Sequence, residues 1–316
     1  MTEIQITSGQ EKQSFDKFLK KYFKAASGGF LYKMLRKKNI TLNKKKADGS
    51  EILQAGDMIQ VFFSDETFSK MRGQEAVSSE YQKLLQVPHE LQVVYEDDLM
   101  LIVNKPSGML SQKASESDIS LNESILSYLI HEGLLSEETY AVFHPSVANR
   151  LDRNTSGIVL AGKTLAGQQF LSDILRDRSA KKIYHCIVRG KVEEEMHLKG
   201  YLLKDERSNQ VQIFSDETQD AKPIETAYRP LVVGPDATLL EVHLITGRSH
   251  QIRAHLASIG HPIAGDPKYG DMVWNKKLRQ DFSVRSQLLH AYSITLPDGR
   301  TFIADEPEIF SQIMRG

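Results

Sequence analysis

Basic residues are concentrated in one short stretch of this 316-residue chain. Positions 12–46 hold twelve lysines and arginines but a single acid, Asp16, so the stretch carries a net charge of +11. The whole chain has a formal charge of −1, which leaves −12 for the remainder. A short run such as Lys44–Lys46 would by itself indicate only a solvated surface. Segregation on this scale is typical of a module that meets a polyanion, and we expect a basic, separately folded N-terminal domain.

The basic segment has a regular internal order. Apolar residues recur at helical spacing within 14–23, which predicts an amphipathic helix with its lysines outside. Ser27-Gly28-Gly29 is expected to end this helix before a second one over 30–38. Short strands are predicted at 40–43 and 59–63, with a tight turn at Ala55-Gly56-Asp57 between them.

This order of two helices, a basic strand, a Gly-Asp turn and a strand resembles the ribosomal-protein S4 type RNA-binding domain over residues 12–64. The resemblance implies a small N-terminal α/β domain, residues 1–64, that binds RNA. It implies RNA contacts from four basic side chains, Lys33, Arg36, Lys37 and Lys44.

The remainder of the chain predicts a second, larger domain. Residues 65–90 are polar and without periodicity, and we interpret them as a linker. A hairpin pattern follows, with strands at 91–96 and 99–104. Further strands are expected at 157–161, 183–188, 238–245 and 292–296, and helices at 122–131, 165–177 and 250–259. Strands and helices do not alternate strictly, so residues 91–316 are predicted to form an α+β domain with a mostly antiparallel sheet.

Several kinds of protein are excluded by what the sequence lacks. Cys186 is the single cysteine, so there is no internal disulfide or multi-cysteine zinc site; its apolar surroundings predict a buried strand position. His250, His255 and His261 are spaced five and six apart, which does not place them on one helical face. Phosphate-loop and dinucleotide motifs are missing, as are signal-peptide and membrane-spanning patterns. We therefore expect a cytoplasmic monomer without a metal or cofactor.

The run Asn149-Arg-Leu-Asp-Arg-Asn-Thr-Ser-Gly157 places a carboxylate, Asp152, in a polar turn before an apolar strand. An acid at the edge of a sheet is accessible to a ligand, and its arginine neighbours at 150 and 153 favour the ionised form. Taken alone, this pattern more often marks a structural aspartate that caps a turn.

The segment Arg150-Leu151-Asp152-Arg-Asn-Thr-Ser-Gly157 resembles the active-site motif of the RluA/RluC/RluD-type pseudouridine synthases. Three further motifs occur in that family's order, at 104–108 (Asn-Lys-Pro-Ser-Gly), 181–184 (Lys-Lys-Ile-Tyr) and 247–255. The third motif continues in the segments 260–266 and 269–270. The resemblance covers residues 91–300. One position departs from it, because the family commonly has His where this chain has Asn149. The departure bears on substrate class more than on activity.

The resemblance implies that the chain isomerises uridine in RNA to pseudouridine. It makes Asp152 the catalytic carboxylate, leaving open whether it acts as nucleophile or base. It places Tyr184 against the target base and makes Arg253 the ion-pair partner of the aspartate. Arg150 would fill the gap left by a flipped nucleotide. Three others, Lys105, Arg248 and His250, would contact phosphate or brace the pocket.

Large-subunit ribosomal RNA is the first expected substrate, and transfer RNA is the alternative. Two other functions remain open on the sequence. One is a non-catalytic RNA-binding or ribosome-assembly factor with the same fold, although Asp152, Tyr184 and Arg253 together argue against it. The other is a nucleosidase or glycosidase, which needs a paired acid and base. No second acid accompanies Asp152 in its motif.

Overall fold

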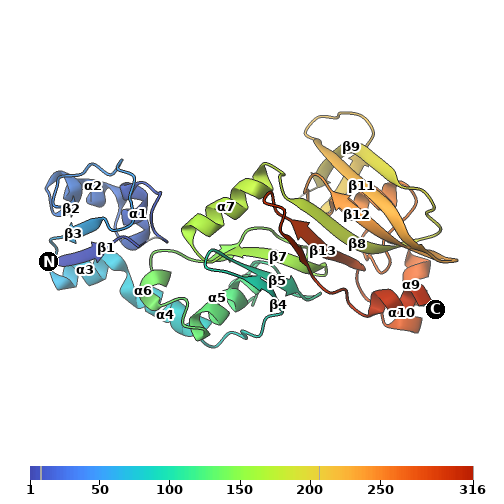
Figure 1. Ribbon diagram of the computed structural model, residues 1–316, viewed down its shortest axis with the longest axis horizontal. Helices are drawn as coiled ribbons and strands as arrows, with labels where there is room; N and C mark the ends of the chain where they lie inside the picture. The colour runs from blue at the N-terminus through green and yellow to red at the C-terminus, as the bar shows by residue number, and fades with distance from the viewer. Residues whose placement is uncertain (8, 206, 316) are drawn as a thin grey trace.

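The computed structural model describes residues 1–7, 9–205 and 207–315, and it shows two folded units joined by helices (Figure 1). The N-terminal unit has a three-stranded antiparallel sheet covered by two helices. Its elements are β1 (Thr2–Gln5), α1 (Phe15–Tyr22), α2 (Gly28–Arg36), β2 (Ile40–Leu42) and β3 (Met58–Val61). Phe15, Phe18 and Leu19 of α1 are fully buried in its core, as the helical spacing predicts.

The predicted break between the first two helices is present, but α2 begins earlier than expected. The Ser27 side chain accepts a hydrogen bond from the N–H of Phe30 (3.3 Å) and so caps the helix. Gly28 and Gly29 are its first two residues rather than part of the break. Strand β1 was not predicted; it pairs with β3 at the edge of the small sheet.

Residues 65–90, predicted to be a linker, are largely helical, with α3 (Asp65–Arg72) and α4 (Gln74–Leu84). The prediction missed them because α3 buries no residue fully, so its sequence carries no apolar period. Ser64 caps α3, and Gly73 takes a left-handed φ of 64° between the helices. Phe68 packs against the N-terminal core and Leu84 joins the larger core, so the helical segment connects the two units.

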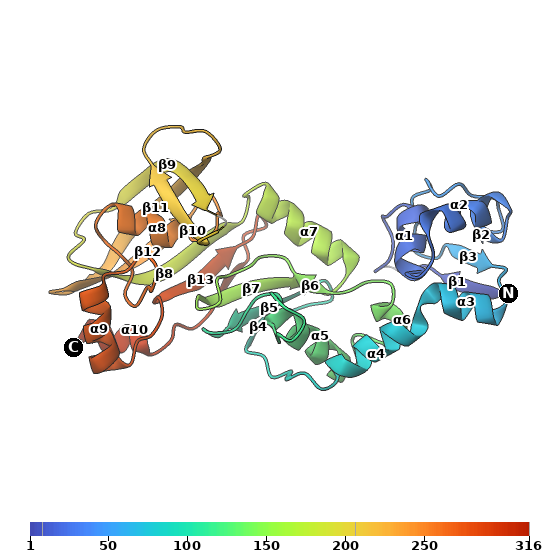
Figure 2. The same cartoon turned by 180° about the vertical axis from the view of Figure 1, so that it is seen from behind.

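The larger unit is built on an eleven-stranded sheet whose main order is β10-β9-β11-β12-β8-β13-β7-β5-β4 (Figures 1 and 2). Its strands are β4 (Val93–Glu96), β5 (Met100–Lys105), β6 (Ser146–Val147), β7 (Ser156–Gly162), β8 (Lys181–Arg189), β9 (Met196–Asp205), β10 (Gln210–Phe214), β11 (Lys222–Val233), β12 (Ala237–Leu244), β13 (Leu289–Thr295) and β14 (Thr301–Ile303). β13 pairs with β7 in parallel and with β8 antiparallel. The predicted α+β, mostly antiparallel architecture is confirmed.

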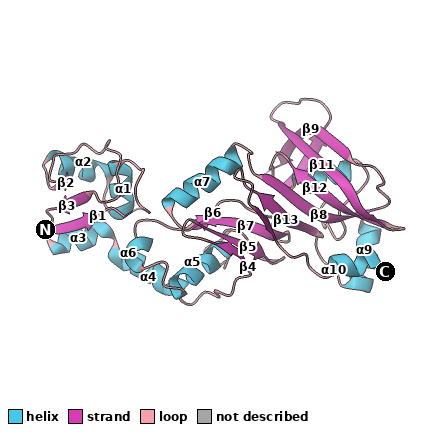
Figure 3. Ribbon diagram, in the orientation of Figure 1, coloured by secondary structure: helices cyan, strands magenta, loops and turns pink. Residues whose placement is uncertain are grey.

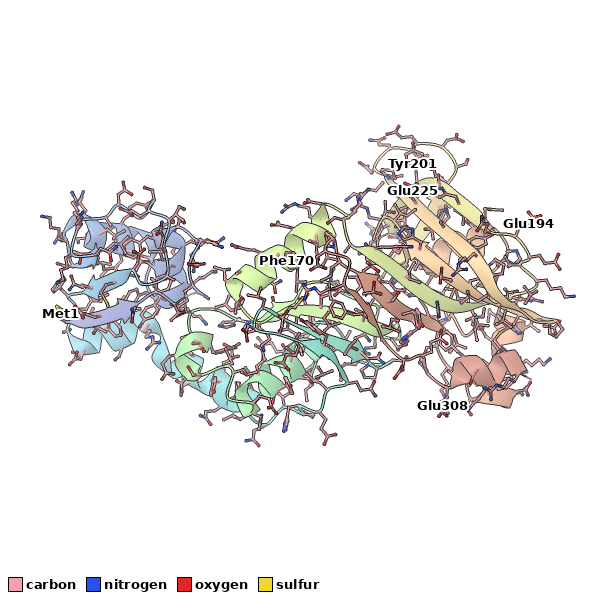
Figure 4. All side chains as sticks on the ribbon, viewed as in Figure 1. Met1, Phe170, Glu194, Tyr201, Glu225 and Glu308 are labelled. Carbon is pink, nitrogen blue, oxygen red and sulfur yellow. The ribbon has the colours of Figure 1, made fainter. Side chains whose placement is uncertain are left out.

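Six helices accompany this sheet: α5 (Leu121–His131), α6 (Glu137–Tyr140), α7 (Leu165–Arg176), α8 (Gln251–Ser258), α9 (Met272–Phe282) and α10 (Ile309–Arg315). α5 and α7 lie on opposite sides of the β7–β5–β4 part (Figures 1 and 2). In Figure 4, Met1 marks the outer end of the N-terminal unit and Glu225 lies on β11 in the larger unit. No helix among the described residues is long and apolar enough to cross a membrane.

The centre of the long sheet is where β7, β13, β8 and β12 are neighbours (Figure 3). Cys186 of β8 is fully buried there, as predicted. Tyr184, two residues earlier, belongs to the same core as Ile252 of α8, and α8 packs against β10 and β11 at the neighbouring end of the sheet. The fold thus brings α8 and β8, and with them residues 253 and 184, to the same region as the start of β7.

Candidate active site

Asp152 lies in the loop that connects β6 to β7, at the edge of the sheet. Hydrogen bonds on either side hold the loop. The Ser111 hydroxyl donates to the carbonyl of Leu151 and accepts from its N–H, both at 3.0 Å. The N–H of Thr155 donates to the carbonyl of Asp152 (3.0 Å), which closes a tight turn. The Asp152 side chain remains 28% exposed, so a ligand can reach it.

Gly157 is the second residue of β7, just after this turn, and cannot be replaced without strain. Its φ is +109°, and a Cβ atom there would lie 2.3 Å from the carbonyl oxygen of Ala291 on β13. Only glycine combines this backbone conformation with so close an approach to the neighbouring strand. The last residue of the Asp152 motif therefore allows the start of β7 to lie this close to β13.

Lys105 was predicted to contact substrate phosphate or to brace the pocket, and its contacts support only the second role. Its side chain is fully buried. The ammonium donates to the carbonyls of Pro106 (2.9 Å), Met109 (2.7 Å) and Arg153 (3.0 Å). Burial lowers the pKa of Lys105 to about 8, although the nearby charge of Asp152 acts to raise it. Lys105 thereby ties the 106–109 loop to the loop that carries Asp152.

Arg253 of α8 joins two carboxylates. Its Nη1 donates to Oδ2 of Asp152 at 2.7 Å, the contact that the sequence resemblance implied. Its Nε and Nη2 donate to Oδ2 and Oδ1 of Asp266, at 2.7 and 2.9 Å. Arg253 is almost completely buried and the Asp266 carboxylate completely so. A guanidinium held in two directions has a fixed plane, and that plane fixes the orientation of Asp152.

Asp266 is the site residue that sequence reasoning missed. It stands in the 260–266 segment but was given no role, because no local pattern links it to residue 253. Burial acts to raise the pKa of Asp266. The bonds and charge of Arg253, with the N–H groups of Lys268 and Tyr269, outweigh burial and hold that pKa below its usual value. The pair is therefore a buried ion pair that is fully hydrogen-bonded.

Tyr184 lies within the field of Asp152. Burial raises the pKa of Tyr184 well above its ordinary value, and the negative charge of Asp152 raises it further. The phenol is therefore neutral and can donate a proton or a hydrogen bond. The fold thus brings together the three residues that the sequence proposed as catalytic, which come from a loop, a strand and a helix.

His250 and Tyr269 line the other side of the carboxylate. The His250 Nε2 atom lies 3.9 Å from Oδ2 of Asp152, and its Nδ1 is 2.9 Å from the Tyr269 hydroxyl. That hydroxyl also accepts the N–H of Val211 on β10 (2.9 Å). Burial lowers the pKa of His250, with the charge of Asp152 opposing it. The Tyr269 ring packs under the Arg253 guanidinium, with 5.3 Å between the guanidinium carbon and the ring centroid.

The remaining predicted positions are arranged around this centre. Arg150 and Arg248 are exposed. Asn149, where the family commonly has His, inserts its amide into the sheet. Its Nδ2 donates to the carbonyl of Ile158 (3.2 Å), and its Oδ1 accepts the N–H of Leu160 (2.8 Å). Asn149 therefore anchors the start of the loop that carries Asp152 to β7, and the described structure has no hydrogen bond between the Asn149 and Asp152 side chains.

The arrangement supplies one accessible carboxylate rather than an acid and base pair. Asp266, the second acid near the centre, is fully buried and uses both oxygens to hold Arg253. It is thus not free to act as the second carboxylate that a glycosidase needs. Within the described residues, no group of three or more His, Cys, Asp and Glu side chains is placed to hold a metal ion.

Known proteins resemble this chain in sequence and in fold. The chain is 32% identical to "Ribosomal large subunit pseudouridine synthase C" of Haemophilus ducreyi, an alignment covering 94% of this chain and 88% of that protein. It is 33% identical to the protein of the same name from Escherichia coli K12, covering 92% and 87%. The solved structure of human RNA Pseudouridylate Synthase Domain Containing 4 shares the fold, with a TM-score of 0.57 and 19% identity over 76% of this chain and 96% of that one.

The family model for RNA pseudouridylate synthase matches residues 99–258, a range that includes Asp152, Tyr184 and Arg253. The match takes in β5 to α8 and ends before Asp266, Tyr269 and β13. The chain therefore belongs to the RNA pseudouridylate synthase family, in its RluA/RluC/RluD group.

Proposed function

We propose that this protein isomerises uridine to pseudouridine in large-subunit ribosomal RNA. The observation that carries the proposal is the accessible Asp152 carboxylate, which Arg253 orients and which is near enough to Tyr184 for its charge to raise the pKa of that phenol. The bacterial relatives described above are named for large-subunit ribosomal RNA, which favours that substrate over transfer RNA. A ribosomal RNA substrate would also place the protein in the cytoplasm.

The chemistry needs a single carboxylate and a pocket for one base. The bond between uracil and ribose breaks, the base rotates, and a carbon–carbon bond replaces the carbon–nitrogen bond. Asp152 Oδ2 is held by Arg253, whereas Oδ1 has no hydrogen-bond partner among the described residues and is free to meet the nucleotide. The Tyr184 ring can stack on the uracil, and its neutral hydroxyl can take part in proton transfer.

The target uridine must leave its helix to reach Asp152, and flipping a base costs a few kcal/mol. Arg150 is exposed in the loop that carries Asp152 and is the candidate to fill the vacated space, because guanidinium groups stack on bases. Two residues that precede α8, Arg248 and His250, are proposed to contact the flipped nucleotide. We propose that the protein does this as a monomer and without a metal or cofactor.

The N-terminal unit is proposed to be an S4-like RNA-binding domain covering residues 1–64. The four side chains named for RNA contact, Lys33, Arg36, Lys37 and Lys44, are all exposed. The first three come from α2 and its end, and Lys44 follows β2. Exposed cations near one another attract a phosphate backbone without reading its sequence.

This assignment predicts a change in the salt dependence of RNA binding. When all four side chains are replaced by Gln, the slope of log affinity against log salt should fall by about 3.6, which is about 0.9 for each lost phosphate contact. The control replaces four other exposed lysines, at positions 83, 191, 276 and 277, by Gln and matches the change in net charge. Equal slopes for the two variants would contradict a localised RNA site in the N-terminal unit.

Mapping pseudouridines in cellular RNA, with and without the gene, tests the function itself. We expect at least one pseudouridine of large-subunit ribosomal RNA to disappear without the gene and to return when the purified protein is added to that RNA. Loss confined to transfer RNA would replace the proposed substrate. An unchanged pattern in both RNAs would refute the enzyme activity.

A further inference from the structure

Lys182 lies on the active-site face of β8, two residues before Tyr184. Alternate residues of a strand point to the same face, roughly 7 Å apart. The register of β8 with β12 is unbroken from Arg189 to Ile183. The pairing with β13 shifts register between Ala291 and Ser293, so the extra residue belongs to β13 and β8 has no inserted residue between Lys182 and Tyr184. Lys182 itself pairs with Ile294 of β13. The lysine therefore borders the pocket in which Tyr184 is proposed to receive the base.

The Lys182 ammonium lies against the loop that leads into α8. A Cβ atom built on Gly247 would be 3.7 Å from the Lys182 Nζ atom. The next residue, Arg248, is exposed. Burial lowers the pKa of Lys182, and the positive charge of Arg178, in the turn before β8, lowers it further. Three cationic residues thus gather at one end of β8, on the side where α8 begins.

No anion balances Lys182 within the described part of the chain, and it has no hydrogen-bond partner there. Lys105 shows the contrast, because its buried ammonium donates to three main-chain carbonyls. A partly desolvated ammonium that has only like-charged neighbours destabilises the fold unless a ligand supplies the negative charge. Lys182 therefore has the features of a ligand-binding lysine rather than of a structural one.

We propose that Lys182, flanked by Arg178 and Arg248, binds a phosphodiester of the RNA beside the uridine that enters the Tyr184 pocket. The inference rests on the proposed function, which brings RNA to this face. A lysine binds phosphate as a compact point charge, and phosphate contacts fix the register of a nucleic acid on a protein. The N-terminal lysines would supply general affinity, whereas Lys182 would hold the backbone of the flipped nucleotide in place.

The test uses binding, not turnover, in the Asp152→Asn protein. The probe is a synthetic RNA hairpin with one loop uridine, in which neutral methylphosphonates replace single phosphodiesters around that uridine. We expect Lys182→Met to weaken binding of the unmodified hairpin about tenfold and to lower the salt slope by about one. A methylphosphonate at one position should weaken binding to the protein that retains Lys182 by a similar factor. The same methylphosphonate should not weaken binding to Lys182→Met any further.

Two variants complete the test. Lys182→Arg keeps the charge and should retain most of the affinity, whereas Lys277→Met removes an exposed lysine of α9 and should change neither affinity nor the methylphosphonate pattern. The proposal would be overturned if Lys182→Met bound the hairpin with full affinity. It would also be overturned if each methylphosphonate weakened binding to Lys182→Met as much as it weakened binding to the Lys182 protein. The modified RNAs keep the result interpretable if Lys182→Met folds poorly. A wild-type protein that makes no pseudouridine, yet shows this non-additive binding, would refute the proposed function and leave the phosphate site standing.

Discussion

Replacing Asp152 with Asn is expected to abolish pseudouridine formation while leaving the fold and RNA binding nearly unchanged. The amide matches the carboxylate in shape but cannot act as nucleophile or base, and we expect the rate to fall by about 10⁴-fold or more. Asp152 is 28% exposed and is not required for the Arg253–Asp266 pair. The dissociation constant for RNA should therefore stay within about threefold, because a charge is removed without a new clash.

The measurement compares single-turnover pseudouridine formation with filter binding of the same ribosomal RNA. Asp177→Asn is the matched control, since it makes the same chemical change on an exposed residue at the end of α7. It should leave both quantities unchanged. Pseudouridine formed at the wild-type rate by Asp152→Asn would contradict the assignment, and so would a loss of binding that accounts for the whole loss of product.

The three residues proposed as catalytic could be predicted because each stands in a recognisable local motif. Asp152 has a turn and a strand after it, Tyr184 lies in an apolar strand, and Arg253 lies in a helical run. Their proximity could not be read from composition or period; it depended on the resemblance to a family. The structure adds the distance, 2.7 Å between Arg253 and Asp152, and leaves the catalytic roles as predictions.

The features that the sequence did not predict are of two kinds. Some depend on contacts between residues distant in the chain, and others are elements whose apolar residues do not recur at a regular spacing. A lysine in this motif could equally bind phosphate or brace the pocket. Only the structure shows that the Lys105 side chain is buried and donates to main-chain carbonyls. Helix α3 buries no side chain fully, so it lacked the apolar repeat that marks a helix. Strands β9 to β11 were missed at the sheet's outer end, where exposed residues are common and the buried pattern is short.

The role of Asp266 also depends on a contact with a residue outside its own motif, the Arg253 side chain. Asp266→Asn places an amide against a buried guanidinium, so one of the two acceptors for Arg253 is lost. Breaking a buried ion pair from one side costs about 3–5 kcal/mol, and we expect the free energy of unfolding to fall by this amount. The freed Arg253 should also tilt away from Asp152 and lower kcat about 100-fold, with little change in RNA binding.

The test measures kcat and KM well below the unfolding midpoint of the variant, together with stability as a function of pH. The pKa of Asp266 in the fold is below its ordinary value of 3.8, so its stabilising contribution is complete above about pH 4 and is lost as the pH falls below that value. Asp266→Asn should lack this part of the acid dependence. Asp298→Asn is the control, because its carboxylate pairs with Arg300 at an exposed turn, where solvent screens the pair and its loss should hardly change stability. A folded Asp266→Asn protein with wild-type kcat would show that Arg253 orients Asp152 without help from the buried acid, and the division of labour between the two carboxylates would then be wrong.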